Sequence, residues 1–185
     1  MIGLKRGAVE LSDYKSEWKQ LYDIEEKIIL SKIKKYVVDI QHIGSTAISN
    51  IISKPIIDIL IGIKDFKELP NIIKILEESV YIYRPEASNN ERCFFVRGTE
   101  NSRTHHIHIV QWNSEEWNNK ILFRDYLINH DEVAKKYCNL KKMLAEKYKY
   151  DRNNYTDGKS NFIKNVIMNS KKKYKFLKVN INMEI

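Results

Sequence analysis

The sequence has few cysteines and no long apolar segment. Among its 185 residues the two cysteines, Cys93 and Cys138, lie far apart and form no Cys-x-x-Cys motif. This usage is typical of reduced thiols and predicts a cytoplasmic protein. No apolar run is long enough to cross a membrane, and the first residues lack the pattern of a signal peptide. We therefore expect no membrane partner.

Most of the chain carries only a small excess of positive charge, although the formal net charge is +8. The lysine-rich end, residues 171–185, contains five lysines and one glutamate and so accounts for half of that excess. We predict that it forms a solvated or interacting tail. The remainder, residues 1–170, is then a mildly basic domain. That balance is compatible with a phosphate-bearing ligand and gives no reason to expect a nucleic-acid groove.

Strand and helix patterns alternate early in the chain, and a helical block closes it. With 43% hydrophobic and 30% charged residues, a chain of this length suits one globular domain, residues 1–170, with a sizeable core. We predict an α/β (α+β) fold in which helices pack on a mixed sheet whose last two strands form a hairpin. The expected strands are residues 36–43, 56–63, 81–83, 92–97 and 104–111, and the expected helices are residues 12–34, 69–79, 114–129, 133–148 and 155–166.

The chain is organised around the turn Gly44-Ser45-Thr46 and the apolar strand that follows it. A small-residue turn can present backbone N–H groups and hydroxyls to a phosphate, so these three residues are candidate phosphate-binding residues. Asp58 interrupts the apolar strand, and a carboxylate buried there needs a metal, a cation or strong hydrogen-bond donors. We predict a catalytic role for Asp58. The alternative is a structural carboxylate that is hydrogen-bonded to the turn.

Five segments carry a specific combination of motifs. They are His-Ile-Gly-Ser-Thr at 42–46, Lys-Pro-Ile-Ile-Asp-Ile-Leu at 54–60, Thr-His-His-Ile-His-Ile-Val at 104–110, Phe-Arg-Asp-Tyr-Leu at 123–127, and residues 155–163. In this order they resemble the GrpB-like family of the nucleotidyltransferase superfamily, over most of the chain. The resemblance implies a nucleotidyltransferase-like fold. It also implies transfer of a nucleoside monophosphate from a nucleoside triphosphate to a small-molecule acceptor, so a nucleotide and a small-molecule substrate are the expected partners.

The second acid of the superfamily's Asp-x-Asp or Asp-x-Glu pair is missing, because Leu60 occupies its position. The GrpB-like pattern also has an aliphatic residue there. Nucleotidyl transfer needs a divalent metal, and magnesium prefers oxygen ligands, so a single carboxylate supplies at most part of such a site. Two hypotheses remain: a metal-dependent nucleotidyltransferase-like enzyme, or a nucleotide- or metabolite-binding protein on the same fold that has lost transfer chemistry.

Two histidines are the candidates to complete a metal site with Asp58. His106 and His108 lie at positions i and i+2 of the last predicted strand, so their side chains project from one face. Two imidazoles and a carboxylate form a common ligand set for zinc, iron or manganese. We expect a divalent metal, magnesium or manganese before zinc, and one cleft that contains Ser45, Asp58 and both histidines. The alternative is that neutral histidines hydrogen-bond a substrate.

Several cations and one tyrosine are candidates to bind phosphate. Lys159 lies on the apolar stripe of its predicted helix, and a cation that points inward needs a carboxylate or a phosphate. We predict that it projects into the cleft of Asp58 and has a catalytic role; the alternative is a stem that reaches solvent. Lys54, just before Pro55, is a further phosphate-binding candidate, with an ordinary exposed lysine as the alternative. Arg92 and Arg124 are candidate phosphate or carboxylate clamps whose positions match the family pattern, and Tyr155 is also a substrate- or phosphate-binding candidate.

Overall fold

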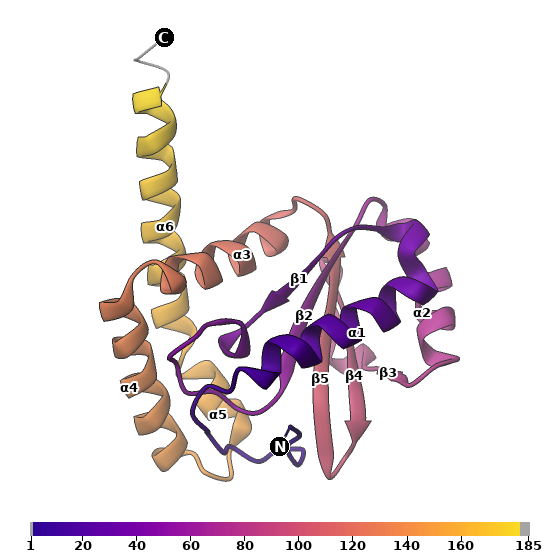
Figure 1. Cartoon of the computed structure of the whole chain (residues 1–185), viewed down its shortest axis with the longest axis horizontal. Coiled ribbons are helices and arrows are strands. Elements are labelled where there is room, and N and C mark those ends of the chain that lie inside the picture. Colours follow the sequence, from indigo (N-terminus) through magenta and orange to yellow (C-terminus); the bar gives the residue numbers. More distant parts are fainter. Residues whose placement is uncertain (1, 182–185) are drawn as a thin grey trace.

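Within the described part of the chain, five strands and six α-helices make up the fold (Figure 1). The computed structural model describes the backbone of residues 2–181 and the side chains of residues 2–173. None of its helices over this range is long and apolar enough to cross a bilayer. In chain order the elements are α1 (Glu17–Ile33), β1 (Val37–Ile43), β2 (Ile57–Ile63), α2 (Leu69–Glu77), β3 (Tyr81–Tyr83), β4 (Arg92–Thr99), β5 (Ser102–Gln111), α3 (Glu115–Ile128), α4 (Asp131–Lys147), α5 (Arg152–Asp157) and α6 (Ser160–Ile181).

The five strands form a mixed sheet in the order β1-β2-β5-β4-β3. The central pair, β2 and β5, is parallel, and the other neighbours are antiparallel. Strands β4 and β5 form the expected hairpin. The predicted fold class and all five predicted strands are confirmed, with boundaries that shift by a few residues at most. The parallel pair matters most for function, because it sets Asp58 directly beside His106.

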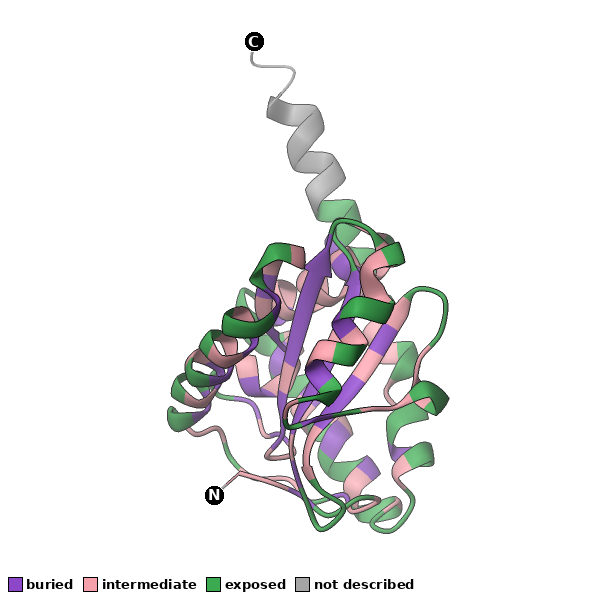
Figure 2. Ribbon diagram, turned by 90° about the vertical axis from the view of Figure 1, so that its right-hand side faces the viewer, coloured by how far each residue is buried: buried purple, intermediate pink, exposed green. Residues whose placement is uncertain are grey.

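Helices α1 and α2 cover one face of the sheet. Ile57, Ile59, Ile61 and Ile63 alternate onto this face and pack with a helical layer that includes Trp18. Each of these five side chains is fully buried. Figure 2 shows the result as strands of buried residues flanked by helices that are buried on one side. This apolar layer is the main core of the molecule, and it leaves the opposite face of the sheet free to carry polar groups.

Helices α3 to α6 lie against the opposite face and around its edge (Figure 1). Trp117 of α3 packs on Leu60 and Val110 of the sheet. A separate apolar cluster joins α3 and α4 to the segment after β1, with Ile48, Ile51 and Tyr137 among its buried members. The helical block is thus anchored at several points, and the polar residues of the sheet lie between these anchors.

One expectation about the last part of the chain was wrong in detail. Over residues 2–181, four helices follow Gln111, not three, because the helix expected at 155–166 is divided between α5 and α6. The division falls at Gly158, where a Cβ atom would lie 2.6 Å from Leu144 Cδ2, so the chain passes α4 too closely for a larger residue. Helix α6 continues through Ile181 without a break at the predicted start of the tail. The division into residues 1–170 and a tail of 171–185 stays a prediction, and residues 182–185 lie outside those described.

Candidate functional site

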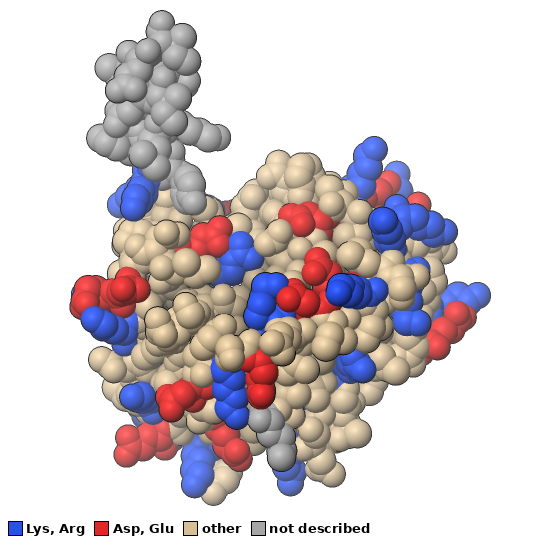
Figure 3. Space-filling model, viewed as in Figure 1, with Lys and Arg blue, Asp and Glu red and all other residues tan. Residues whose placement is uncertain are grey.

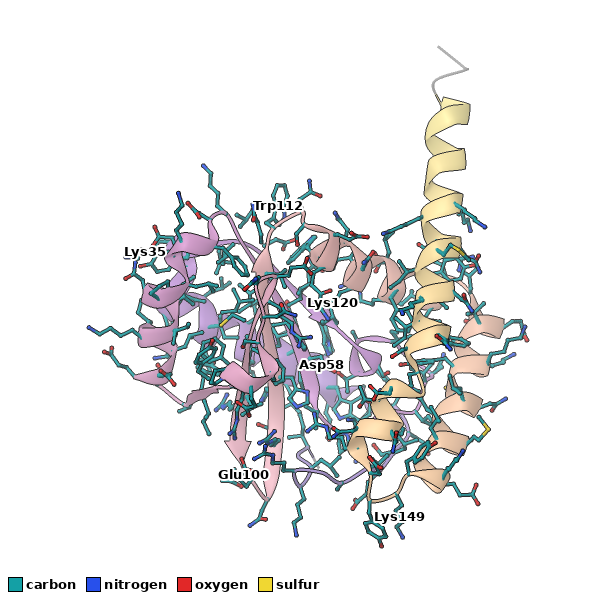
Figure 4. The ribbon with its side chains drawn as sticks, turned by 180° about the vertical axis from the view of Figure 1, so that it is seen from behind. Lys35, Asp58, Glu100, Trp112, Lys120 and Lys149 are labelled. Carbon is teal, nitrogen blue, oxygen red and sulfur yellow. The ribbon has the colours of Figure 1, made fainter. Side chains whose placement is uncertain are left out.

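A cavity of about 430 Å³ lies between the sheet and the C-terminal helices. Figure 4 labels two of its residues, Asp58 from β2 and Lys120 from α3. The cavity therefore brings together side chains from strands and helices that are far apart in the sequence. Eight of the predicted site residues line it: Gly44, Ser45, Lys54, Asp58, His106, His108, Tyr155 and Lys159.

Gly44 allows the Asp58 carboxylate to lie against the turn. The strand register sets Ile43 opposite Asp58, so the chain turns directly beside the carboxylate. Gly44 has φ of 69°, and a Cβ atom at this position would overlap Asp58 Oδ2. Both the positive φ and the close approach require glycine. A short 3-10 helix, η2 (Ser45–Ala47), follows at once.

The carboxylate of Asp58 is the centre of a hydrogen-bonded group. His106 Nδ1 lies 3.1 Å and His108 Nε2 lies 3.8 Å from Asp58 Oδ1. Burial opposes ionisation of Asp58, but the hydrogen bond from His106 and the nearby His108 imidazole hold its pKa well below the usual range. Burial also lowers the pKa of His106, and it lowers that of His108 to about 4. At neutral pH the group is therefore an ionised carboxylate with two neutral imidazoles, and we assign His106 Nδ1 as an N–H donor to it.

The same group is a poor fit for the predicted divalent metal. The described residues contain no cluster of three or more His, Cys, Asp or Glu side chains placed to hold a metal ion. The imidazole nitrogens that face Asp58 are directed at its oxygen. The remaining nitrogens, His106 Nε2 and His108 Nδ1, are buried and have no hydrogen-bond partner within the described part of the chain. Asp58 and the two histidines therefore bind one another and do not converge on a point where a metal ion would lie.

A second polar group connects helix α4 to the Gly44-Ser45 turn. Lys141 is 2% exposed, and its amine lies 3.1 Å from Ser45 Oγ and also donates to the carbonyl of Ile52. Its Nζ lies 4.6 Å from the centre of the Tyr137 ring. Burial lowers the pKa of Lys141 to about 7. This amine fixes the Ser45 side chain at the wall of the cavity.

Two further lysines meet at Tyr155. The amines of Lys159 and Lys54 lie 4.5 Å and 5.5 Å from the centre of its buried ring. Burial lowers the pKa of Lys54 to about 7, with help from the nearby Lys159 and Arg152 charges, and it lowers that of Lys159 to about 8. Lys159 is placed in the predicted cleft, immediately before the first residue of α6. Tyr155 provides a cation–π platform for both amines.

Three predicted phosphate-binding residues do not line the cavity. Thr46 is buried and its hydroxyl is 3.0 Å from His42 Nε2. Arg92 donates to the carbonyl of Ala87, in the loop before β4. Arg124 donates to the His42 carbonyl from α3 and so ties that helix to β1. In this structure all three make structural contacts.

Sequence reasoning missed three cations of the cavity wall, Lys120, Lys141 and Arg152. Lys141 had a visible signal, because it lies four residues after Tyr137 and three before Leu144, on the apolar face of α4. Lys120 pairs with Glu116 at 3.1 Å. Arg152 begins α5, a helix too short to be recognised by its periodicity. No local pattern distinguishes this arginine from a solvated one.

Comparison with known proteins identifies the family. The model of the family described as GrpB protein matches residues 8–169. The chain belongs to the GrpB family. It is 38% identical over 171 residues to the glutamate-rich protein GrpB of Alkalihalophilus pseudofirmus, covering 90% of this chain and 98% of that one. It is 34% identical over 164 residues to the protein YqkA of Bacillus subtilis, covering 89% of this chain and 48% of that one.

Solved structures relate the GrpB fold to the nucleotidyltransferases. The crystal structure of the conserved protein GrpB from Enterococcus faecalis matches with a TM-score of 0.82 and 30% identity, over 89% of this chain and 99% of that one. The Cid1 poly(U) polymerase, in a mutant bound to MgATP, matches with a TM-score of 0.52 and 12% identity, over 74% of this chain and 44% of that one. At 12% identity, the similarity to Cid1 concerns the fold alone. That fold is nucleotidyltransferase-like, as predicted.

Proposed function

We propose that the central cavity binds a nucleotide or another phosphorylated metabolite through its phosphates. The observation that carries this proposal is the charge of the cavity wall. Among the described side chains, five cations line the cavity and only two carboxylates do, and one of these, Glu116, is already paired with Lys120. The other four cations, Lys54, Lys141, Arg152 and Lys159, share the cavity with one remaining acid, Asp58.

Clustered cations without matching acids are costly unless a ligand supplies the negative charge. Burial is the main cause of the lowered pKa values of Lys54, Lys141 and Lys159, and a neighbouring cation lowers each of them further, so each amine releases its proton more readily than an exposed lysine. The volume of about 430 Å³ lies within the range of about 300–1,000 Å³ of small-molecule sites. The nucleotidyltransferase-like sheet supports a nucleotide as the first ligand to test.

The experiment is calorimetric titration with ATP, GTP, UTP and pyrophosphate, with adenosine as an uncharged control. Replacing Lys159 with Met keeps the length of the side chain and removes its charge, and we expect triphosphate binding to weaken about tenfold or more. The matched control is Lys135→Met, because Lys135 is an exposed lysine of α4 outside the cavity. Equal binding by the parent and the Lys159→Met variant would exclude Lys159 from the site.

Transfer of a nucleoside monophosphate to a small-molecule acceptor is the second candidate function. It is favoured by Asp58 beside the Gly44-Ser45 turn, on a sheet of the nucleotidyltransferase type, and Leu60 at the second acid position counts against it. A general base works best with a pKa near the working pH. Asp58 is too acidic for that task, whereas Lys159, with a pKa of about 8, is suited to take the proton of an acceptor hydroxyl that displaces pyrophosphate.

Pyrophosphate release separates these two functions. Labelled nucleoside triphosphate is incubated with the protein and a mixture of small-molecule acceptors, with magnesium, with manganese and with neither. If the parent protein releases pyrophosphate faster than the Asp58→Asn and Lys159→Met variants, transfer is supported. Comparison of the three metal conditions tests the expected divalent metal. Nucleotide binding without pyrophosphate release under all three conditions supports the function of a nucleotide- or metabolite-binding protein.

A further inference from the structure

We propose that the cavity holds the phosphates of its ligand without a divalent metal, and that Lys54, Lys141, Arg152 and Lys159 provide the positive charge that magnesium supplies in metal-dependent sites. This inference rests on the proposed function, because it concerns how the same cavity binds its phosphorylated ligand. It is carried by three observations: the missing carboxylates, the partners of Asp58, and the origin of the four cations.

Among the described residues, the cavity lacks the carboxylates that would hold magnesium against a polyphosphate. Leu60 is fully buried in an apolar cluster with Ile43, Val110 and Trp117, so its position has no space for a hydrated ion. The second carboxylate that lines the cavity, Glu116, is an ion-pair partner of Lys120. Magnesium needs oxygen ligands at near-octahedral geometry, and it keeps water where the protein supplies few of them. Asp58 alone is a weak anchor.

The carboxylate of Asp58 is already occupied by protein donors. His106 and His108 direct ring nitrogens at the same oxygen of Asp58, at 3.1 Å and 3.8 Å. A metal ion that bound this oxygen would have to displace the hydrogen bond from His106. The carboxylate is instead held as an anion that accepts this hydrogen bond, lies close to the His108 ring and packs against Gly44.

The four cations come from separate segments that converge on one cavity. Lys54 precedes β2, Lys141 comes from α4, Arg152 begins α5, and Lys159 precedes α6. In their protonated forms all four groups would repel an added divalent ion and attract a metal-free polyphosphate, and a bound phosphate itself favours the protonated form of the lysines. Because bound Mg²⁺ cancels two negative charges of the ligand, the free polyphosphate is the better electrostatic match. The ligand class is therefore a phosphate ester or polyphosphate that carries its full charge.

The test compares two media with the unmodified protein. ATP and inorganic tripolyphosphate are titrated calorimetrically in EDTA and again in excess magnesium chloride at the same ionic strength. We expect binding in EDTA to be about threefold tighter or more, since the magnesium complex carries less charge. A requirement for magnesium or manganese, with affinity at least about tenfold higher in the metal, would overturn the inference while leaving the proposed function intact. Absence of binding in both media would remove both proposals.

Replacing Asp58 with Asn should change ligand affinity in opposite directions for metal-dependent and metal-free binding. If Asp58 held a metal, Asp58→Asn would abolish binding in magnesium. Under metal-free binding, Asp58→Asn removes a negative charge that faces the phosphates, so affinity rises severalfold in EDTA and does not fall in magnesium. The matched control is Glu132→Gln, an exposed acid of α4, which should leave the affinity unchanged. Weaker binding by a folded Asp58→Asn protein would count against the proposal.

Discussion

Binding of a phosphate ligand should be accompanied by proton uptake. In the free protein, burial lowers the pKa of Lys54 and Lys141 to about 7 and that of Lys159 to about 8. A bound phosphate favours the ammonium form and raises these pKa values again. Each amine that is neutral before binding must therefore take up a proton from solution. Affinity should fall as the pH rises through the pKa values of the free protein.

The size of the effect follows from these values. At pH 7.5 a lysine with a pKa of about 7 is deprotonated in about three quarters of the molecules, and one with a pKa of about 8 in about one quarter. Lys54, Lys141 and Lys159 together should then take up about two protons when a triphosphate binds. Between pH 7.5 and pH 9, where the terminal phosphate no longer titrates, each lysine of pKa about 7 should weaken binding by about 20-fold.

Calorimetry in buffers of different ionisation enthalpy measures the uptake directly. The slope of the observed enthalpy against the buffer enthalpy gives the number of protons per ligand, and the Lys54→Met variant should reduce it by about 0.8. The Lys135→Met variant should leave it unchanged, because Lys135 is exposed and paired with Glu132. A slope near zero, or an affinity that does not fall between pH 7.5 and pH 9, would refute this view of the buried lysines.

Three further substitutions test separate parts of the molecule. Lys141→Met removes a buried cation. The free energy of unfolding, measured by urea titration, should stay within about 2 kcal/mol of the parent or rise. Triphosphate affinity, measured by calorimetry, should fall about tenfold. Glu25→Gln should cost about 2–4 kcal/mol in urea unfolding without changing ligand affinity, because Glu25 is the buried partner of Arg97 on the α1 face. Gly44→Ala should cost about 1–2 kcal/mol and also weaken binding, since its Cβ atom would displace Asp58; a variant that is as stable as the parent would contradict this.

The sheet was predictable because its strands have a clear period. In β5 the alternation separates Ile107 and Ile109, which pack in the core under α1, from His106 and His108, which face the cavity. The same reasoning located Asp58 on the cavity side. The side-chain alternation of a strand depends only on the order of neighbouring residues, so the sequence alone is sufficient to predict which side chains share a face. Lys159 was also expected in the cavity of Asp58 and lines it, although it lies between α5 and α6 and not on the single amphipathic helix from which it was predicted.

The helical half was less predictable because tertiary contacts decide its details. At the boundary between α5 and α6, Gly158 packs closely against Leu144 of α4, a tertiary contact that no local pattern predicts. Arg124 was a candidate because its position matches the family pattern, yet it donates to the carbonyl of His42 and so ties α3 to β1. Which arginine binds a ligand and which satisfies a carbonyl depends on three-dimensional position.

The charges on the outer face explain why net charge was a poor guide. Over α1 in Figure 3, lysine and arginine side chains are interspersed with acids, and no continuous basic stripe crosses the described part of this face. The concentration of positive charge lies instead in the internal cavity, where Lys54, Lys141 and Lys159 converge. A formal charge summed over the chain cannot distinguish a dispersed excess from a focused one.

The composite origin of the cavity wall links ligand occupancy to the cohesion of the molecule. A phosphate that contacts Lys54, Lys141 and Lys159 at once connects the segment before β2 to two helices of the C-terminal block. Such a ligand links these segments only while it is bound. A ligand concentration of about 100 times the dissociation constant should therefore stabilise the native state by about 2.7 kcal/mol. If α4 or α6 separated from the sheet, the lysine contacts to such a phosphate would be lost in the same event. Protection of these helices from hydrogen exchange should therefore rise and fall with the metabolite concentration, which would make the protein a reporter of its own ligand.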